Sequence, residues 1–277
     1  MKGFIMMVVS VALISLLVVF AASLHESHLE MERALAKPQA LDYAAFFFDD
    51  TADSLNSLLG PEIALNKTNA TTTLKISGLL PVKNSSADLA QYETFLEGRF
   101  ANQTGALADA NFSNMSGGRV SLIINEKYFY SADPASKDMI FSAQNSTNAS
   151  SYSLVVTTDF ARGNYVPFNF SSGGDLAVDI RFSDASGSMV WSGKVYSNQQ
   201  NRMDMNYSDG STLSIEIGRT HGSDGSLWMR NTGASPAEVS WSAILPKADS
   251  DKRFGYEYNA SLSYVQGPIR VARRIGR

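Results

Sequence analysis

Residues 176–182 read LAVDIRF, a run in which apolar side chains alternate with small or charged ones. A period of two places Leu176, Val178 and Ile180 on one face of a half-buried β-strand. The same alternation recurs at 120–124, 213–217, 239–245 and 258–264. Gly, Asp and Ser separate such runs, as in SDASGS at 183–188 and HGSDGS at 221–226, and these residues favour turns. Many short strands at this spacing predict an antiparallel β-sandwich.

The segment before these runs is more mixed. Thr72 to Ser77 has the composition of a strand, and Ser86 to Phe100 (SADLAQYETFLEGRF) that of a helix for which Ser85 or Ser86 supplies the cap. Residues 61–118 are therefore expected to combine loops with a short helix, and residues 119–277 to form a β-rich head.

The amino-terminal part has a different character. Phe4 to Leu24 (FIMMVVSVALISLLVVFAASL) is uncharged over 21 residues, which as a helix would span about 31 Å, close to the roughly 30 Å of a bilayer core. Lys2 precedes the run and Glu26 follows it. The positive-inside rule then predicts a single-pass protein with its N-terminus in the cytoplasm and its head outside. The alternative is a cleaved secretory signal ending near Ala21 or Ser23.

Helical character continues from residue 25 to Gly60-Pro61, a helix stop signal. Apolar residues recur at spacings of three and four, namely Leu41, Ala45, Phe48, Ala52, Leu55 and Leu59, which predicts one stripe that packs on a domain or on neighbouring helices. Pro38 is expected to kink or break this helix near Ala36 and Lys37. The predicted fold class is α+β, a long N-terminal hydrophobic and amphipathic helix followed by a mostly antiparallel β-sandwich head.

The chain is rich in N-x-[ST] acceptor triplets for N-glycosylation. With 17 Asn and 50 Ser plus Thr among 277 residues, chance predicts about three. Eleven are present, at Asn66, Asn69, Asn84, Asn102, Asn111, Asn114, Asn145, Asn148, Asn169, Asn206 and Asn259, and none lies in residues 1–65. A glycan on asparagine is bulky and needs solvent. The triplets therefore predict a glycosylated surface outside the cell, on which these asparagines are exposed.

Composition excludes several kinds of chemistry. The chain contains no Cys, so disulfides, thiolate zinc sites and cysteine nucleophiles are ruled out. A net charge of −4 lacks the positive balance that is typical of nucleic-acid-binding proteins. His25, His28 and Glu32 share a helix face that is better explained as a polar ring beside the membrane than as a metal site, and no catalytic triad surrounds His221. We predict no metal, no cofactor and no catalytic residue.

Other charged and aromatic side chains admit more than one interpretation. The acidic pairs Asp49 with Asp50 and Asp249 with Asp251 are read as solvated faces rather than as a glycosidase pair. The basic end, Arg270, Arg273, Arg274 and Arg277, could face anionic lipid, acidic glycans or a neighbouring subunit, or be a solvated terminus. Trp191, Trp228 and Trp241 are the first candidates for a ligand face, although Trp241 alternates with core positions.

Lys2-Gly3-Phe4 followed by the apolar run resembles the type IV pilin-like surface proteins of archaea. The resemblance implies a leader of residues 1–3, cleaved by a prepilin peptidase between Gly3 and Phe4. It also implies that residues 4–24 form a transmembrane or assembly helix, that residues 25–60 extend this helix outside the cell, and that the β-rich head faces out. Copies of the chain or other pilin-like subunits would be the partners, alongside the lipid bilayer.

The expected function is that of a pilin-like, N-glycosylated structural subunit of the cell surface, in a filament or in its assembly, and not of an enzyme. The alternative is a permanently anchored single-pass protein whose sandwich head binds carbohydrate or protein. A surface hydrolase is the least favoured of the three, because no catalytic constellation stands out. The mature N-terminus separates the first two: it lies at Phe4 in a pilin and at Met1 in a fixed anchor.

Overall fold

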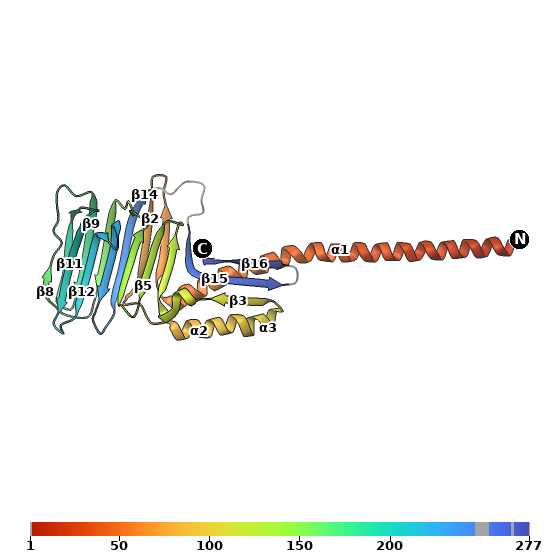
Figure 1. Cartoon of the computed structure of the whole chain (residues 1–277), viewed down its shortest axis with the longest axis horizontal. Coiled ribbons are helices and arrows are strands. Elements are labelled where there is room, and N and C mark those ends of the chain that lie inside the picture. The colour runs from red at the N-terminus through yellow and green to blue at the C-terminus, as the bar shows by residue number, and fades with distance from the viewer. Residues whose placement is uncertain (1, 247–254, 267–268, 277) are drawn as a thin grey trace.

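The computed structural model describes residues 2–246, 255–266 and 269–276. A helix of 58 residues, α1 (Lys2–Leu59), leaves a β-rich head and points away from it (Figure 1). Within α1 the side chains are described at residues 15, 18–27 and 41–59. The expected membrane contact of Phe4 to Leu24 and the expected cleavage between Gly3 and Phe4 therefore fall largely outside the described side chains.

The predicted α+β fold class is wrong. The chain is mostly β, with 53% strand and 22% helix in two sheets. The helix α1 is long, but a long apolar helix is not found among the residues whose side chains are described, which form only the short stretches 18–27 and 41–59. The prediction gave too much weight to the apolar run and too little to the segment after Gly60, which supplies three strands rather than mainly loops.

Among the described residues, no helix is both long enough and apolar enough to cross a membrane.

The first sheet, sheet A, has six strands in the order β1-β2-β14-β7-β9-β10. Their bounds are β1 Glu62–Lys67, β2 Thr71–Leu80, β7 Ser151–Thr157, β9 Leu176–Asp184, β10 Gly187–Val195 and β14 Ala237–Pro246. All neighbours are antiparallel except β7 and β9, which run parallel. The strand predicted at Thr72 to Ser77 lies inside β2, the partner of β14 in this sheet.

The second sheet, sheet B, has ten strands in the order β16-β15-β4-β5-β6-β13-β12-β11-β8, with β3 paired to β15 beside this path. Their bounds are β3 Leu107–Asn111, β4 Val120–Ile124, β5 Tyr128–Asp133, β6 Asp138–Ala143, β8 Arg162–Val166, β11 Gln200–Tyr207, β12 Thr212–Thr220, β13 Ser223–Asn231, β15 Tyr256–Gln266 and β16 Ile269–Gly276. The short helices are α2 (Ser86–Thr94), a π-helical turn η1 (Phe95–Phe100), α3 (Ala101–Thr104) and a 3₁₀ turn η2 (Ser113–Gly118).

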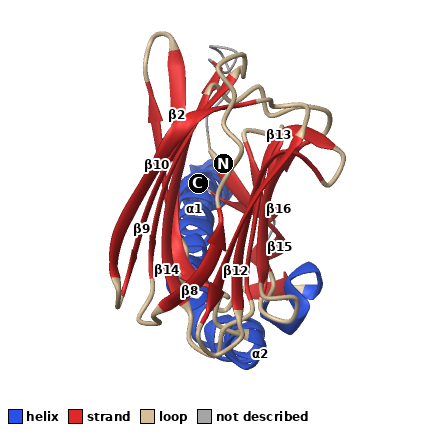
Figure 2. Ribbon diagram, turned by 90° about the vertical axis from the view of Figure 1, so that its left-hand side faces the viewer, coloured by secondary structure: helices blue, strands red, loops and turns tan. Residues whose placement is uncertain are grey.

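The two sheets lie face to face and bury their alternating apolar side chains between them (Figure 2). An aromatic cluster fills the middle of this core. Trp241 of β14 lies with its ring centroid 4.9 Å from Phe141 of β6, and Tyr130 and Tyr152 complete the group. Sheet A and sheet B both contribute rings, so the cluster joins the layers.

The last third of α1 holds the helix on the head. Phe48, Ala52, Leu55 and Leu59 are buried as the apolar stripe predicts, whereas Leu41 and Ala45 of the same stripe are exposed. Asn56 forms side-chain hydrogen bonds with Tyr256, at 2.7 Å, and with Tyr258. The helix runs unbroken through Pro38, so the predicted break there does not occur. It ends at Gly60, whose φ of +86° is the left-handed cap typical of a helix terminus.

Candidate functional site

The asparagines of the eleven triplets lie on the surface of the head. Ten of them are exposed and Asn259 is half-buried. They lie in turns, short helices and strands at the surface of the head, and a glycan needs such exposure. Asn66 lies near the end of β1 and Asn69 in the turn between β1 and β2, and Asn145 and Asn148 lie in the connection between β6 and β7. The predicted exposure of these asparagines is confirmed, while their occupancy by glycan stays a prediction.

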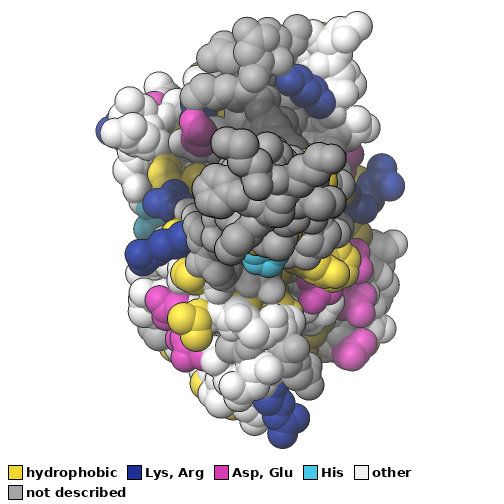
Figure 3. Space-filling model, turned by 90° about the vertical axis from the view of Figure 1, so that its right-hand side faces the viewer, with side chains coloured by type: hydrophobic (Ala, Val, Ile, Leu, Met, Phe, Trp, Pro, Cys, Tyr) yellow, Lys and Arg dark blue, Asp and Glu magenta, His cyan; other side chains and the backbone are white. Residues whose placement is uncertain are grey.

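A groove lined by aromatic side chains lies where α1 leaves the head. It has a volume of about 480 Å³ and is lined by Tyr43, Phe46, Phe47, Asp50, Phe100, Thr104, Tyr264 and Gln266. Phe47 is buried and stacks on Phe100, with the two ring centroids 4.3 Å apart. Phe46 and Tyr43 on the same helix are 71% and 66% exposed. Figure 3 looks along α1 onto this end of the head, where hydrophobic side chains lie beside the helix. Large exposed apolar groups in one place are typical of interaction sites.

A second cleft, of about 590 Å³, lies at the other end of the docked helix segment. The chain from Ser57 to Glu62 forms one wall, and Ser77, Leu79, Val155, Glu238 and Ser240 on the outer face of sheet A line it as well. The hydroxyls of Ser77 and Ser240 are 2.9 Å apart. The carboxylates of Glu62 and Glu238 and the negative end of the α1 dipole favour a cationic group here. Lys83, which also lines the cleft, forms a 2.8 Å ion pair with Asp88.

The three tryptophans each pack against other side chains. Trp241 is 1% exposed, so its predicted burial is confirmed. Trp228 donates from Nε1 to Asp138 at 3.2 Å, and the Arg202 guanidinium lies 5.8 Å from its ring. The ring centroids of Trp191 in β10 and Tyr165 in β8 are 5.6 Å apart. The Trp228 ring is therefore partly covered on the outer face of sheet B, which makes it a poor platform for stacking a sugar.

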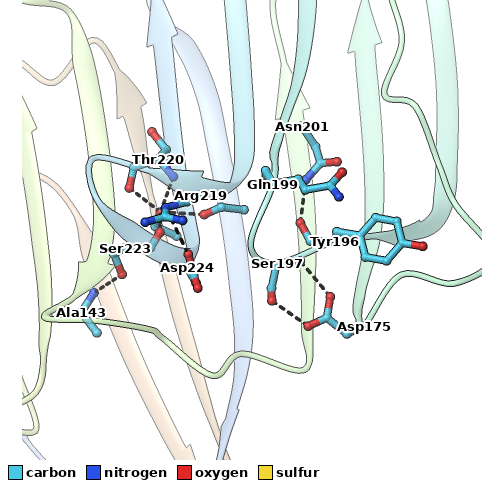
Figure 4. A network of polar contacts seen from close by, with 12 residues as sticks. Ala143, Asp175, Tyr196, Ser197, Gln199, Asn201, Arg219, Thr220, Ser223 and Asp224 are labelled. Atoms are coloured by element: carbon cyan, nitrogen blue, oxygen red, sulfur yellow. Dashed lines mark hydrogen bonds and ion pairs between the residues drawn. The ribbon is translucent and has the colours of Figure 1, made fainter.

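A polar network ties together the turns at one end of the sandwich (Figure 4). Asp175 accepts two hydrogen bonds from Ser197, from the backbone N at 2.8 Å and from Oγ at 2.6 Å. The Asn201 Nδ2 group donates to the carbonyl oxygens of Tyr196 and Gln199, each at 2.9 Å. Gly218, with φ of +115°, passes so close to Gln199 that a Cβ would collide with the Gln199 carbonyl. The network orders the loops and holds no catalytic arrangement of its own.

The hydrogen bonds from Ser197 lower the pKa of Asp175 below its usual value. A carboxylate whose pKa is lowered on folding stabilises the native state above its unfolded pKa, and this contribution is lost as the pH falls through the folded pKa. We therefore expect the thermal midpoint of the head to fall on acidification from about pH 5 to pH 2.5, and to fall less in D175N. Circular dichroism melts at several pH values measure this, with D50N on exposed α1 as the control. Parallel pH profiles for wild type and D175N would contradict the assignment.

The remaining predicted residues are not brought together into a site. His25 is exposed, while the side chains of His28 and Glu32 lie outside the described residues, as do Asp249, Asp251 and Arg277. His221 stands in the β12–β13 turn, with its ring 6.5 Å from Trp228. In the part of the chain that the structure describes, no group of three or more His, Asp or Glu is placed to hold a metal ion.

The basic C-terminal strand turns toward the chain's own helix. Arg273 of β16 lies 4.5 Å over the ring of Phe48 and 3.7 Å from the Asp49 carboxylate. Arg274 lies 3.9 Å from Glu257. Two of the four arginines thus have acidic neighbours within the same chain, a pairing that the sequence pattern did not predict.

Sequence reasoning missed two features of the surface. Glu62 and Glu238 were not singled out, because only the pairing of β2 with both β1 and β14 brings their strands close together. Tyr43 carried no signal either. Comparison of the chain with protein-family models, with curated proteins and with solved structures finds no match.

Proposed function

We propose that the protein is a pilin-like, N-glycosylated structural subunit of the cell surface, with its head outside the cell. The observation that carries the proposal is the distribution of acceptor triplets. Eleven of them surround the head, ten with an exposed asparagine and one with a half-buried one, and none lies in residues 1–65. A surface evolved to carry glycans must face solvent, whereas a surface without them is free to pack.

The shape of α1 supports the same proposal. At 1.5 Å per residue its 58 residues extend about 87 Å, and the first buried residue among its described side chains is Ala44. The N-terminal part of α1 stands clear of the head (Figure 1). In this proposal the uncharged run Phe4 to Leu24 attaches the subunit to the membrane, with Lys2 on the cytoplasmic side.

The aromatic groove gives the proposal a surface for self-association. Leu41, Tyr43 and Phe46 are all more than half exposed on the helix that bears no acceptor triplet. Covering such side chains with a second copy of the chain would remove apolar area from water at about 25 cal/mol per Å². Copies of the chain, or subunits of the same kind, are therefore the partners that we propose.

The mature N-terminus tests the proposal. Mass spectrometry of the protein from its native membrane is expected to find a chain that begins at Phe4, with glycan on several of the eleven asparagines. A chain that begins near Ala22 or Leu24 would mean ordinary secretion and would contradict the pilin-like function. Glycosylation at none of the asparagines would contradict the glycosylated surface.

A second candidate is a permanently anchored head that binds a ligand. The cleft lined by Glu62, Glu238 and the end of α1 favours it, because its acidic side chains and hydroxyls suit a cationic group. An intact Met1 at the mature N-terminus would support this candidate over the first.

A further inference from the structure

The cleft of about 590 Å³ has in its wall a backbone acceptor that the fold leaves without a donor. In an α-helix a carbonyl oxygen accepts from the N–H four residues later. For Ser57 that residue is Pro61, which has no N–H. The Asn56 carbonyl oxygen accepts from the backbone N of Gly60 at 3.1 Å, and that of Leu58 accepts from a serine hydroxyl at 2.9 Å. No described residue donates to the Ser57 oxygen, so it can accept from a ligand.

Two carboxylates stand on the same side of the cleft. Glu62 of β1 pairs with Ser77 of β2, and Glu238 of β14 pairs with Leu79, two residues further along β2. Their Cα atoms therefore lie about 12 Å apart, two strand spacings across the sheet and two residues along it. Both glutamates are exposed, and neither forms an ion pair with another described residue. The two negative charges are thus separate and available to a ligand.

The rest of the lining sets the character of the ligand between these charges. Leu79 and Val155 are 46% and 43% exposed on the outer face of sheet A, so the floor of the cleft is partly apolar. The cation of the lining, Lys83, is already held by Asp88 at 2.8 Å. An anion would face two carboxylates and the negative end of α1. The cleft therefore suits a ligand with positive ends and an apolar middle.

We infer that this cleft binds a linear aliphatic diamine, a molecule with an ammonium group at each end of a methylene chain. An ammonium group carries three N–H donors, so one end donates to the Glu62 carboxylate and to the Ser57 carbonyl oxygen. The other end donates to Glu238, and the methylene chain lies over Leu79. The inference goes beyond the pilin-like function, on which it does not depend, and gives the head a ligand.

A metal ion is a poorer match for the same cleft. Ca²⁺ takes six to eight oxygen ligands, and the described residues place no group of three or more His, Asp or Glu together. A diamine needs only one carboxylate at each end, which is the arrangement that Glu62 and Glu238 provide.

The choice of ligand tests whether both charges are used. Isothermal titration of the full-length, detergent-solubilised protein compares 1,5-diaminopentane with pentylamine, which has the same methylene chain and one charge. The diamine is expected to bind at least tenfold more tightly, and its affinity is expected to fall as salt is added. Equal affinities for the two amines, or no heat of binding with the diamine, would overturn the inference.

Charge-removing variants test whether the cleft is the place of binding. E62Q and E238Q each remove one carboxylate and keep the size of the side chain, so each is expected to weaken diamine binding at least tenfold. D42N is the control, because it removes one charge from an exposed position of α1 and should bind as wild type does. Equal binding in E62Q, E238Q and wild type would contradict the site, and so would equal weakening in D42N.

These titrations can fail independently of the pilin-like function. Loss of the diamine site would leave the mature N-terminus at Phe4 and the glycans unaffected. A mature N-terminus near Ala22 would contradict the pilin-like function and would leave the diamine site in place, because the residues of the cleft all follow Asn56.

Discussion

Replacing Trp241 with alanine is expected to destabilise the head by about 3–5 kcal/mol. The side chain is 1% exposed and lies between the rings of Phe141, Tyr130 and Tyr152, which come from both sheets. Removing the side chain leaves a cavity between the two sheets, and the surrounding aromatic rings lose their contacts with it. Denaturant unfolding measures the loss of stability. It is followed by circular dichroism rather than by tryptophan fluorescence, because the variant lacks this tryptophan.

W241F is the matched control for this prediction. The Trp241 Nε1 donor is buried and has no hydrogen-bond partner among the described residues, and an unpaired buried donor costs about 1–3 kcal/mol. Phenylalanine removes the donor and keeps most of the ring, so its cost is expected to stay below about 2 kcal/mol. If W241F destabilised the head as much as W241A, the aromatic cluster would depend on a hydrogen bond from Nε1.

Local patterns predicted most of the strands but not their neighbours. The alternation at 176–182 and 239–245 places the correct side chains inward, in β9 and β14. The alternation alone does not show that β2 pairs with β14 or that β7 runs parallel to β9. Those contacts join residues 26 to 175 positions apart, and they depend on how the layers fit rather than on the local period.

Helix α1 shows a second limit of prediction from local sequence patterns. Periodicity identified one apolar stripe from Leu41 to Leu59, yet the head covers it only from Phe48 onward. A pattern marks which face of a helix is apolar and cannot mark where the covering domain ends. The fold class failed for a related reason, because the apolar run at the N-terminus is easily counted, whereas the strands β1 and β3 carry weaker local signals.

The acceptor triplets were the most informative part of the candidate site. Their surplus predicted exposed asparagines, and ten of the eleven are exposed. The hydrogen bond between the side chains of Asn114 and Asn259 could not be predicted, because it depends on η2 packing beside β15. The exposure of these asparagines could thus be predicted from sequence, whereas a contact between two of them needs the fold.

Replacing Phe46 with glutamate is expected to weaken self-association of the full-length protein more than tenfold. Phe46 is 71% exposed beside the aromatic groove, so the change should alter the stability of the single subunit by no more than about 0.5 kcal/mol. In an interface between copies, the same change would bury a charge against apolar rings, which is costly without a partner. Sedimentation of the detergent-solubilised protein measures the association, and circular dichroism measures the stability.

V166E is the control for this prediction. Val166 of β8 is 58% exposed and lies at the end of the head remote from α1 (Figure 1). If the groove is the contact between copies, V166E should associate as wild type does, because it adds the same charge to a surface that no copy covers. Equal association of F46E and wild type would show that the exposed aromatics of α1 are not an interface. Equal weakening in both variants would mean that added charge, rather than the groove, controls association.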